Sequence, residues 1–95
     1  MAKPKTEVYF VFMNFDPEYE RLRGDRSKKG GEALDAYLNC KHDRLLQELF
    51  TPNTYKKRSS LAIVDGFAVE MTHEQAAKLR AAKEVRVVEK NQELA

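Results

Sequence analysis

The segment that decides the fold is V-D-G-F-A-V-E-M-T, Val64–Thr72, which runs directly into the helix start T-H-E-Q. Successive side chains of a strand point to opposite faces, so this segment has two unlike sides. One side carries large apolar residues, namely Phe67, Val69 and Met71. The other side carries Gly66, Ala68 and Glu70, which leave the backbone nearly uncovered. We expect the first side to face the core and the second to be approached closely by a neighbour.

The composition is typical of one small globular domain, which we expect to span residues 1–95. The chain is 42% apolar and 34% charged, and its net charge of +2 is too balanced to predict nucleic-acid binding from the field alone. The longest apolar run, Val8–Met13, is too short to cross a membrane, and no signal-peptide core follows M-A-K-P-K. The single cysteine, Cys40, excludes an internal disulfide and a cysteine-based metal cluster. We therefore expect neither a membrane nor a nucleic-acid partner.

The residues before the central segment predict a strand, a loop and a helix. Residues 1–6 are expected to form a flexible lead-in. Val8–Asn14 is β-branched and aromatic on both sides, so a strand here leaves one apolar face uncovered. Phe15–Gly31 contains three glycines and a basic cluster, and we expect a loop in which Tyr19–Arg23 can form a turn of helix. The basic cluster is interpreted as a solvated loop or as a docking arm for an acidic partner. Leucines at helical spacing predict a helix over Glu32–Phe50.

The residues around and after the central segment complete the set of elements. Thr54–Val64 begins with polar and basic residues, which suits an edge strand. Asp65-Gly66 predicts the turn of a hairpin. Thr72–Lys83 is expected to be a capped, alanine-rich helix, Glu84–Glu89 the last strand and residues 90–95 an exposed tail. The order strand, helix, strand, strand, helix, strand predicts an α+β, ferredoxin-like βαββαβ fold, with two helices on one face of a four-stranded antiparallel sheet.

No enzyme constellation is found in the sequence. The two histidines, His42 and His73, lie on different predicted helices and have no metal-ligand partners at suitable spacing. Cys40 is two residues from His42 on one helix and points elsewhere. We therefore predict no catalytic residue, no metal and no cofactor. His42 falls on the apolar side of its helix, where we interpret it as a core-edge histidine bonded to backbone or water, or alternatively as a pH sensor.

An open ferredoxin-like sheet is also found in RNA-recognition domains, but the residues do not fit. Their third-strand motif opens with Lys or Arg, where this chain has Asp65, and requires a second aromatic residue, where this chain has Val69. Glu70 would also face phosphates with the wrong sign of charge.

The ordered motifs of the chain resemble the propeptides of subtilisin-like serine proteases, also found as small free-standing protease inhibitors. The block Asp65–Thr72 is similar to the family's Asn-Gly-Phe-Ala-x-x-Leu-Thr, with Asp65 in place of the usual Asn. The opening strand V-Y-F-V, the first helix with H-D-R-L-L and the exit E-K-N occur in the family's order. The stretch H-D-R-L-L-Q-E-L-F with T-Y-K-K indicates a plant subtilase.

The resemblance implies an inhibitor and intramolecular chaperone that docks on surface helices of the protease through its open sheet face. The residues implied for this face are Gly66, Ala68, Glu70, Tyr9, Val11 and Met13, although the set Val8, Phe10 and Phe12 fits the first strand equally well. The tail would enter the active-site cleft as an added strand, with Asn91, Gln92, Glu93, Leu94 and Ala95. Matched to bacterial propeptides, the tail stops a little short of the cleavage point. A separate hypothesis, which rests only on the presence of the two histidines, is that His42 or His73 charges on acidification and loosens the complex.

Two functions remain open at this point. The first is a propeptide-type inhibitor, which would travel the secretory pathway as part of a precursor, or act in the cytoplasm if it stands alone. The second is a ferredoxin-like interaction or regulatory domain with a partner other than a protease.

Overall fold

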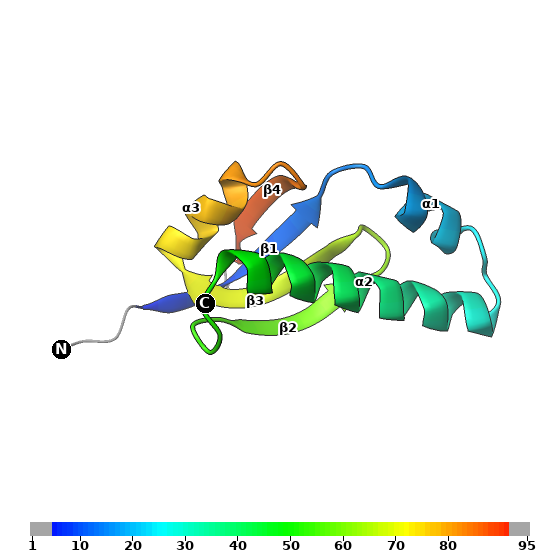
Figure 1. Ribbon diagram of the computed structural model, residues 1–95, viewed down its shortest axis with the longest axis horizontal. Helices are drawn as coiled ribbons and strands as arrows, with labels where there is room; N and C mark the ends of the chain where they lie inside the picture. The colour runs from blue at the N-terminus through cyan, green and yellow to red at the C-terminus, as the bar shows by residue number, and fades with distance from the viewer. Residues whose placement is uncertain (1–4, 92–95) are drawn as a thin grey trace.

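The computed structural model describes residues 5–91, which form an α+β fold of three helices and four strands (Figure 1). Along the chain the elements are β1 (Thr6–Met13), α1 (Pro17–Arg23), α2 (Lys28–Leu49), β2 (Lys56–Leu61), β3 (Gly66–Thr72), α3 (His73–Ala81) and β4 (Val85–Lys90). Apart from the added α1, this is the predicted ferredoxin-like order.

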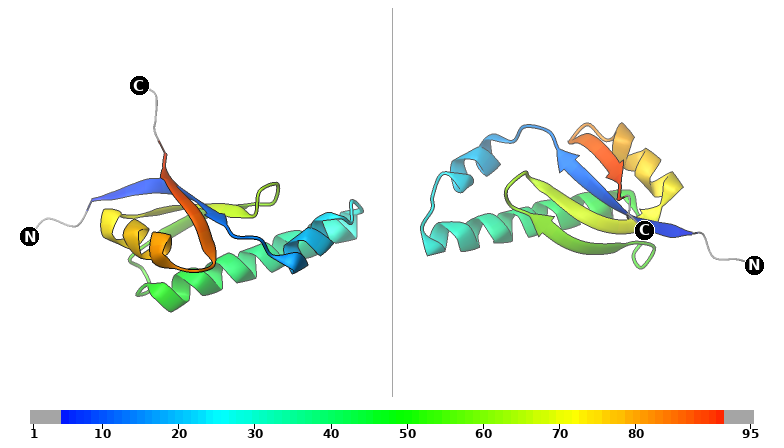
Figure 2. Two further views of the ribbon diagram at one scale, coloured as in Figure 1. Left: turned by 90° about the horizontal axis from the view of Figure 1, so that it is seen from above. Right: turned by 180° about the vertical axis from the view of Figure 1, so that it is seen from behind.

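The four strands form one antiparallel sheet in the order β2-β3-β1-β4. The central strands β1 and β3 pair over their whole length, with Tyr9 opposite Val69 and Phe10 opposite Ala68. Helices α2 and α3 cover one face of this sheet, and the other face has no helix over it (Figure 2). The predicted architecture with an uncovered sheet face is therefore confirmed.

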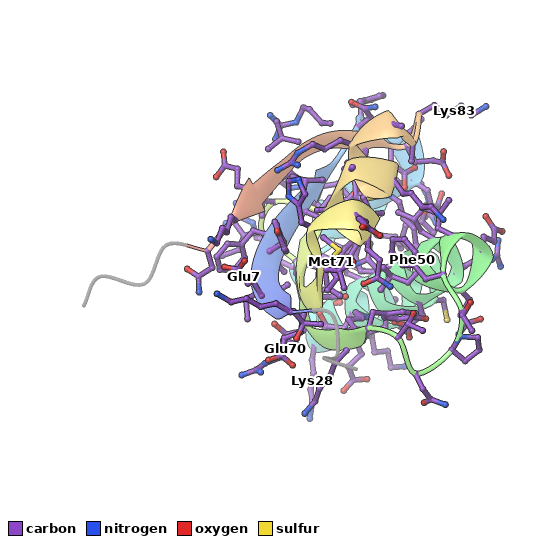
Figure 3. The ribbon with its side chains drawn as sticks, turned by 90° about the vertical axis from the view of Figure 1, so that its left-hand side faces the viewer. Glu7, Lys28, Phe50, Glu70, Met71 and Lys83 are labelled. Carbon is purple, nitrogen blue, oxygen red and sulfur yellow. The ribbon has the colours of Figure 1, made fainter. Side chains whose placement is uncertain are left out.

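The main core lies between the sheet and the two helices. The central strand β3 contributes three side chains with no exposed surface, Phe67, Val69 and Met71. Figure 3 shows Met71 on the helix side of the sheet and Glu70 on the outer side. Helix α3 packs closely through Ala76 and Leu79, both fully buried. The assignment of the apolar side of β3 to the core is thus correct.

Helix α3 begins as its sequence predicts. The Thr72 hydroxyl accepts from the backbone N–H of Gln75 at 3.1 Å, and the Gln75 side chain accepts from the N–H of Thr72 at 2.9 Å. This reciprocal capping box pairs two N–H groups that a helix start otherwise leaves without partners.

The prediction of a loop over residues 15–31 is wrong, because most of it is helical. Asp16 caps α1 by accepting from the N–H of Glu18, and Pro17 supplies a first helical residue that needs no N–H partner. Ser27 then caps α2, which starts four residues before the predicted Glu32. Helix α1 and the first half of α2 extend past the end of the sheet (Figure 1). They are held by a second apolar cluster of Tyr19, Leu34 and Leu38.

The hairpin between β2 and β3 also differs from its prediction. The turn spans residues 62–65, and Gly66 is already the first residue of β3. Asp65, rather than the glycine, adopts the left-handed backbone, with φ of 44°. Because Asp and Asn tolerate this conformation better than other residues with a Cβ, an acidic side chain is tolerated at this point.

Candidate functional site

The uncovered face of the sheet is the candidate binding surface, and β1 supplies its apolar residues. Val8, Phe10 and Phe12 are half-buried and stand opposite Glu70, Ala68 and Gly66 of β3. Cross-strand partners in an antiparallel sheet share a face, so these residues form one surface. On β4, Val87 pairs with Phe12 and joins the same face. We call Val8, Phe10, Phe12 and Val87 the open face.

The assignment of Tyr9, Val11 and Met13 to this face is wrong. Their side chains are 3%, 0% and 5% exposed and belong to the main core. The register explains the error, because Tyr9 pairs with Val69 and therefore points beneath the helices with it. Since β1 is apolar on both sides, its sequence alone did not distinguish the two faces.

Gly66 and Ala68 lie on the open-face side of β3, but the surface there is not bare. A Cβ added to Gly66 would stand 2.7 Å from the carbonyl oxygen of Val11 and 3.2 Å from the Phe12 ring. Ala68 is 7% exposed. At Gly66 the small residue is therefore needed by the protein's own β1, where the Val11 carbonyl and the Phe12 ring take the space that we expected a neighbour to occupy.

Glu70 is the acidic residue of this side of β3. Its side chain is one-third exposed, and its carboxylate forms an ion pair with Arg58 of β2 at 3.0 Å. It pairs across the sheet with Val8 on one side and Lys56 on the other. Glu70 is thus an accessible charge at the border of an apolar surface.

A second notable feature lies on the opposite side of the sheet, where His42 is completely buried. Its Nε2 lies 2.9 Å from Oδ1 of Asp65, and its Nδ1 lies 2.8 Å from the hydroxyl of Ser60. The ring packs against Phe67 with centroids 4.7 Å apart. A neutral imidazole satisfies both contacts, with Nε2–H donating to the carboxylate and Nδ1 accepting from the hydroxyl. The expectation of a core-edge histidine bonded to backbone or water is corrected to a fully buried one bonded to side chains.

Lys41 extends this contact into a network that joins three elements. Its ammonium lies 2.6 Å from Asp65 in the hairpin turn and 2.8 Å from Asp16 before α1. Tyr37 donates to the same Asp16 oxygen at 2.6 Å. We call Asp16, Lys41, His42 and Asp65 the polar brace, since it ties α2 to the hairpin and to the start of α1.

Burial and the contacts within the polar brace shift the pKa values of its members and of the neighbouring Tyr37. Burial alone would raise the pKa of Asp65, but hydrogen bonds from His42 and Lys41 outweigh it and lower that pKa. Burial likewise opposes the charge of Lys41, whose two carboxylate partners nonetheless raise its pKa. For His42 burial is the stronger effect, and its pKa falls below the ordinary 6.5 although Asp65 acts in the other direction. Burial and the Asp16 carboxylate raise the pKa of Tyr37 to about 12.

The contacts of His42 bring together the three residue types of a hydrolase triad, with Ser60 on one side of the ring and Asp65 on the other. Their arrangement is nonetheless structural. A nucleophile needs room for a carbonyl beside its hydroxyl and donors for the developing oxyanion. Here the histidine has no exposed surface and carries the Phe67 ring against it. The group therefore stabilises the hairpin rather than performing chemistry.

The other predicted site residues are not brought together. His73 is exposed at the start of α3, away from the buried His42. Of the predicted tail, Asn91 donates its N–H to the carbonyl of Val8 at 2.8 Å, and residues 92–95 lie outside the described part. Within residues 5–91, no group of three or more His, Cys, Asp or Glu side chains is placed to hold a metal ion. No helix in that range has the length and apolar character needed to cross a bilayer.

The uncovered apolar face of this ferredoxin-like sheet is a candidate binding surface. The family profile described as peptidase inhibitor I9 matches residues 35–95. The chain is 34% identical over 101 residues to subtilisin-like protease SBT2.5 and 31% identical to SBT2.6, both of Arabidopsis thaliana. Each alignment covers 90% of this chain and 12% of the relative, so the chain spans about an eighth of their length. No solved structure is significantly similar to the chain.

The chain belongs to the peptidase inhibitor I9 family. This is the family of inhibitory propeptide domains of subtilisin-like proteases, so the chain is an inhibitor domain and not a catalytic one. The resemblance to subtilase propeptides, with its plant character, is confirmed.

Proposed function

We propose that this domain inhibits a subtilisin-like catalytic domain by docking through the open face. The observation that carries the proposal is the row Val8, Phe10 and Phe12, apolar and not covered by any helix of the described chain. A contiguous apolar surface that is only half-buried within the domain is typical of interaction sites. Its burial against a partner is worth about 25 cal/mol per Å² of apolar area before the costs of association.

Glu70 contributes an electrostatic interaction to the docking. Its one-third exposed side chain stands beside Val8 at the border of the open face. Surface helices of a partner present unpaired N–H groups and a positive dipole end at their N-termini, and a carboxylate suits both. We propose that Glu70 exchanges its contact with Arg58 for such a helix end.

The tail after β4 completes the inhibition in this proposal. Asn91 still pairs with β1, so the last described residue lies beside Val8 of the open face. An extended segment that follows can add as a strand to the substrate cleft of the protease and occupy it as a product does. The assigned tail residues after Asn91 are Gln92, Glu93, Leu94 and Ala95.

The same docking can assist folding of the protease. A ligand that binds the native state alone stabilises that state by RT ln(1 + [L]/Kd). If the domain is attached to its catalytic domain, as its relatives' length suggests, the effective concentration is high. We propose the chaperone role on this basis, and with it a route through the secretory pathway.

Acidification is proposed to weaken the complex through His42 rather than His73. Protonated His42 would be a buried cation whose neighbours are the Asp65 carboxylate and the ammonium groups of Lys41 and Lys57. Its folded pKa is lowered, so its contribution to stability is complete above pH 6.5 and is lost as the pH falls below that value. The exposed His73 has no such burial.

The test is titration of a plant subtilisin-like protease with the purified chain at neutral pH. The proposal predicts inhibition in the nanomolar-to-micromolar range. A folded chain that neither binds nor inhibits any subtilase would leave the interaction-domain alternative, which no observation favours at present.

A further inference from the structure

The β2–β3 turn exposes two apolar side chains where a turn ordinarily carries polar residues or glycine. Ile63 is 82% exposed and Val64 is 45% exposed. Both are β-branched, a type that turns disfavour and strands prefer. Residues whose intrinsic preference conflicts with their local structure, and which add no stabilising contact within the fold, are expected mainly at functional positions.

This turn is held firmly on both sides of the two exposed residues. On one side Tyr19 donates its hydroxyl to the carbonyl of Ala62 at 2.6 Å. On the other, Asp65 is fixed by the polar brace, and its carbonyl accepts from the N–H of Met13 at 3.0 Å. The fold therefore presents Ile63 and Val64 in a fixed position rather than on a loose loop.

The turn is also continuous with the open face. Gly66, which follows the turn directly, pairs with Phe12 of β1, one of the open-face residues. A partner that covers Phe12 would therefore reach the end of the sheet from which the turn extends. Figure 2 shows the turn projecting beyond the paired strands, at the end opposite the start of β1.

We propose that Ile63 and Val64 form a second contact with the subtilase catalytic domain, inserting into an apolar depression beside the surface that the open face covers. The inference rests on the proposed function and adds to it a determinant of partner choice outside the tail. The partner is argued from the continuity with the open face and from the relatives, which are subtilisin-like proteases extending far beyond the aligned region. A braced turn loses little conformational freedom on binding, so burial of these side chains is realised as affinity.

The test compares two double variants in inhibition of a subtilisin-like protease that the wild-type chain inhibits. Ile63→Ser with Val64→Ser removes the apolar surface and should raise the inhibition constant at least about tenfold. The matched control exchanges the two residues, Ile63→Val with Val64→Ile, and should stay within about twofold because it keeps apolar, β-branched side chains. Both variants should unfold at the midpoint of the wild type, since neither residue is part of the core.

The outcomes separate this inference from the function on which it rests. A wild-type chain that inhibits no subtilase contradicts the proposed function itself. A wild-type chain that inhibits, together with a serine variant within twofold of it, overturns only the role of the turn. A serine variant that changes self-association in light scattering and leaves inhibition unaltered assigns the turn to contacts between copies, which also overturns the proposal.

Discussion

β3 is stabilised in different ways along its middle and at its start. Along its middle, Phe67, Val69 and Met71 are buried among apolar side chains of α2, α3 and β1. At its start, Asp65 is held by charged and polar partners from α2. Apolar burial does not depend on protonation, whereas the contacts of the polar brace do. The fold can therefore keep its core while the hairpin end responds to pH.

The largest effect is expected in the apolar core. Phe67→Ala removes a fully buried ring and should lower the free energy of unfolding by about 3–5 kcal/mol, a large part of the 5–15 kcal/mol typical of a domain. Phe15→Ala is the matched control, since that ring is 80% exposed and its loss should cost less than about 0.5 kcal/mol. Urea unfolding followed by circular dichroism measures both. Equal costs would contradict the assignment of the core.

A smaller effect is expected from the polar brace. Lys41→Met leaves the carboxylates of Asp16 and Asp65 without their shared cation, and should cost about 1–3 kcal/mol at neutral pH. Lys78→Met, on the exposed side of α3, is the control and should change little. A Lys41 variant as stable as the wild type would show that the brace does not hold the hairpin.

The pH dependence of the free energy of unfolding should show which of the two histidines responds to acid. As the pH falls from 6.5 to 5, His42 should lower the free energy of unfolding by at most about 1.4 kcal/mol per pH unit, because its folded pKa lies below the ordinary value. His42→Gln should flatten this part of the profile, whereas His73→Gln should leave it unchanged. A flattened profile for the His73 variant alone would assign the acid response to His73. Identical pH profiles for the wild type and both variants would show that His42 does not contribute to the response.

The smallest effect on stability is expected at the edge of the open face. Glu70→Lys breaks an ion pair with Arg58 that is partly exposed, so unfolding should change by less than about 1 kcal/mol. Inhibition should nonetheless weaken, because a positive charge would face the positive end of the partner's helix. Glu74→Lys is an exposed acidic control on α3. Unchanged inhibition by the Glu70 variant would limit the docking surface to apolar residues.

Much of this fold follows from its sequence because several signals are local. The capping box of Thr72 and Gln75 lies within four residues, and the two sides of β3 differ sharply in size. Motif order was also sufficient to identify the inhibitor family.

What could not be predicted depends on contacts between distant residues. Helix α1 has little apolar periodicity, and its position is fixed through Tyr19, which bonds a carbonyl 43 residues away. A side chain at Gly66 would clash with the Val11 carbonyl and the Phe12 ring of the neighbouring β1, which no local pattern reveals. The pairing of His42 with Asp65 is indicated only by the acid that stands in place of the family's usual Asn.

The most direct test of the account is the inhibition constant of Phe10→Thr against a subtilisin-like protease that the wild-type chain inhibits. Threonine keeps the preference for a strand while removing the ring at the centre of the open face. Ala77→Ser, on the exposed side of α3, is the control. Docking through the open face predicts at least about a tenfold rise in the inhibition constant of the Phe10 variant, with unfolding close to that of the wild type and no change for the control. Inhibition as strong as that of the wild type would contradict docking through the open face.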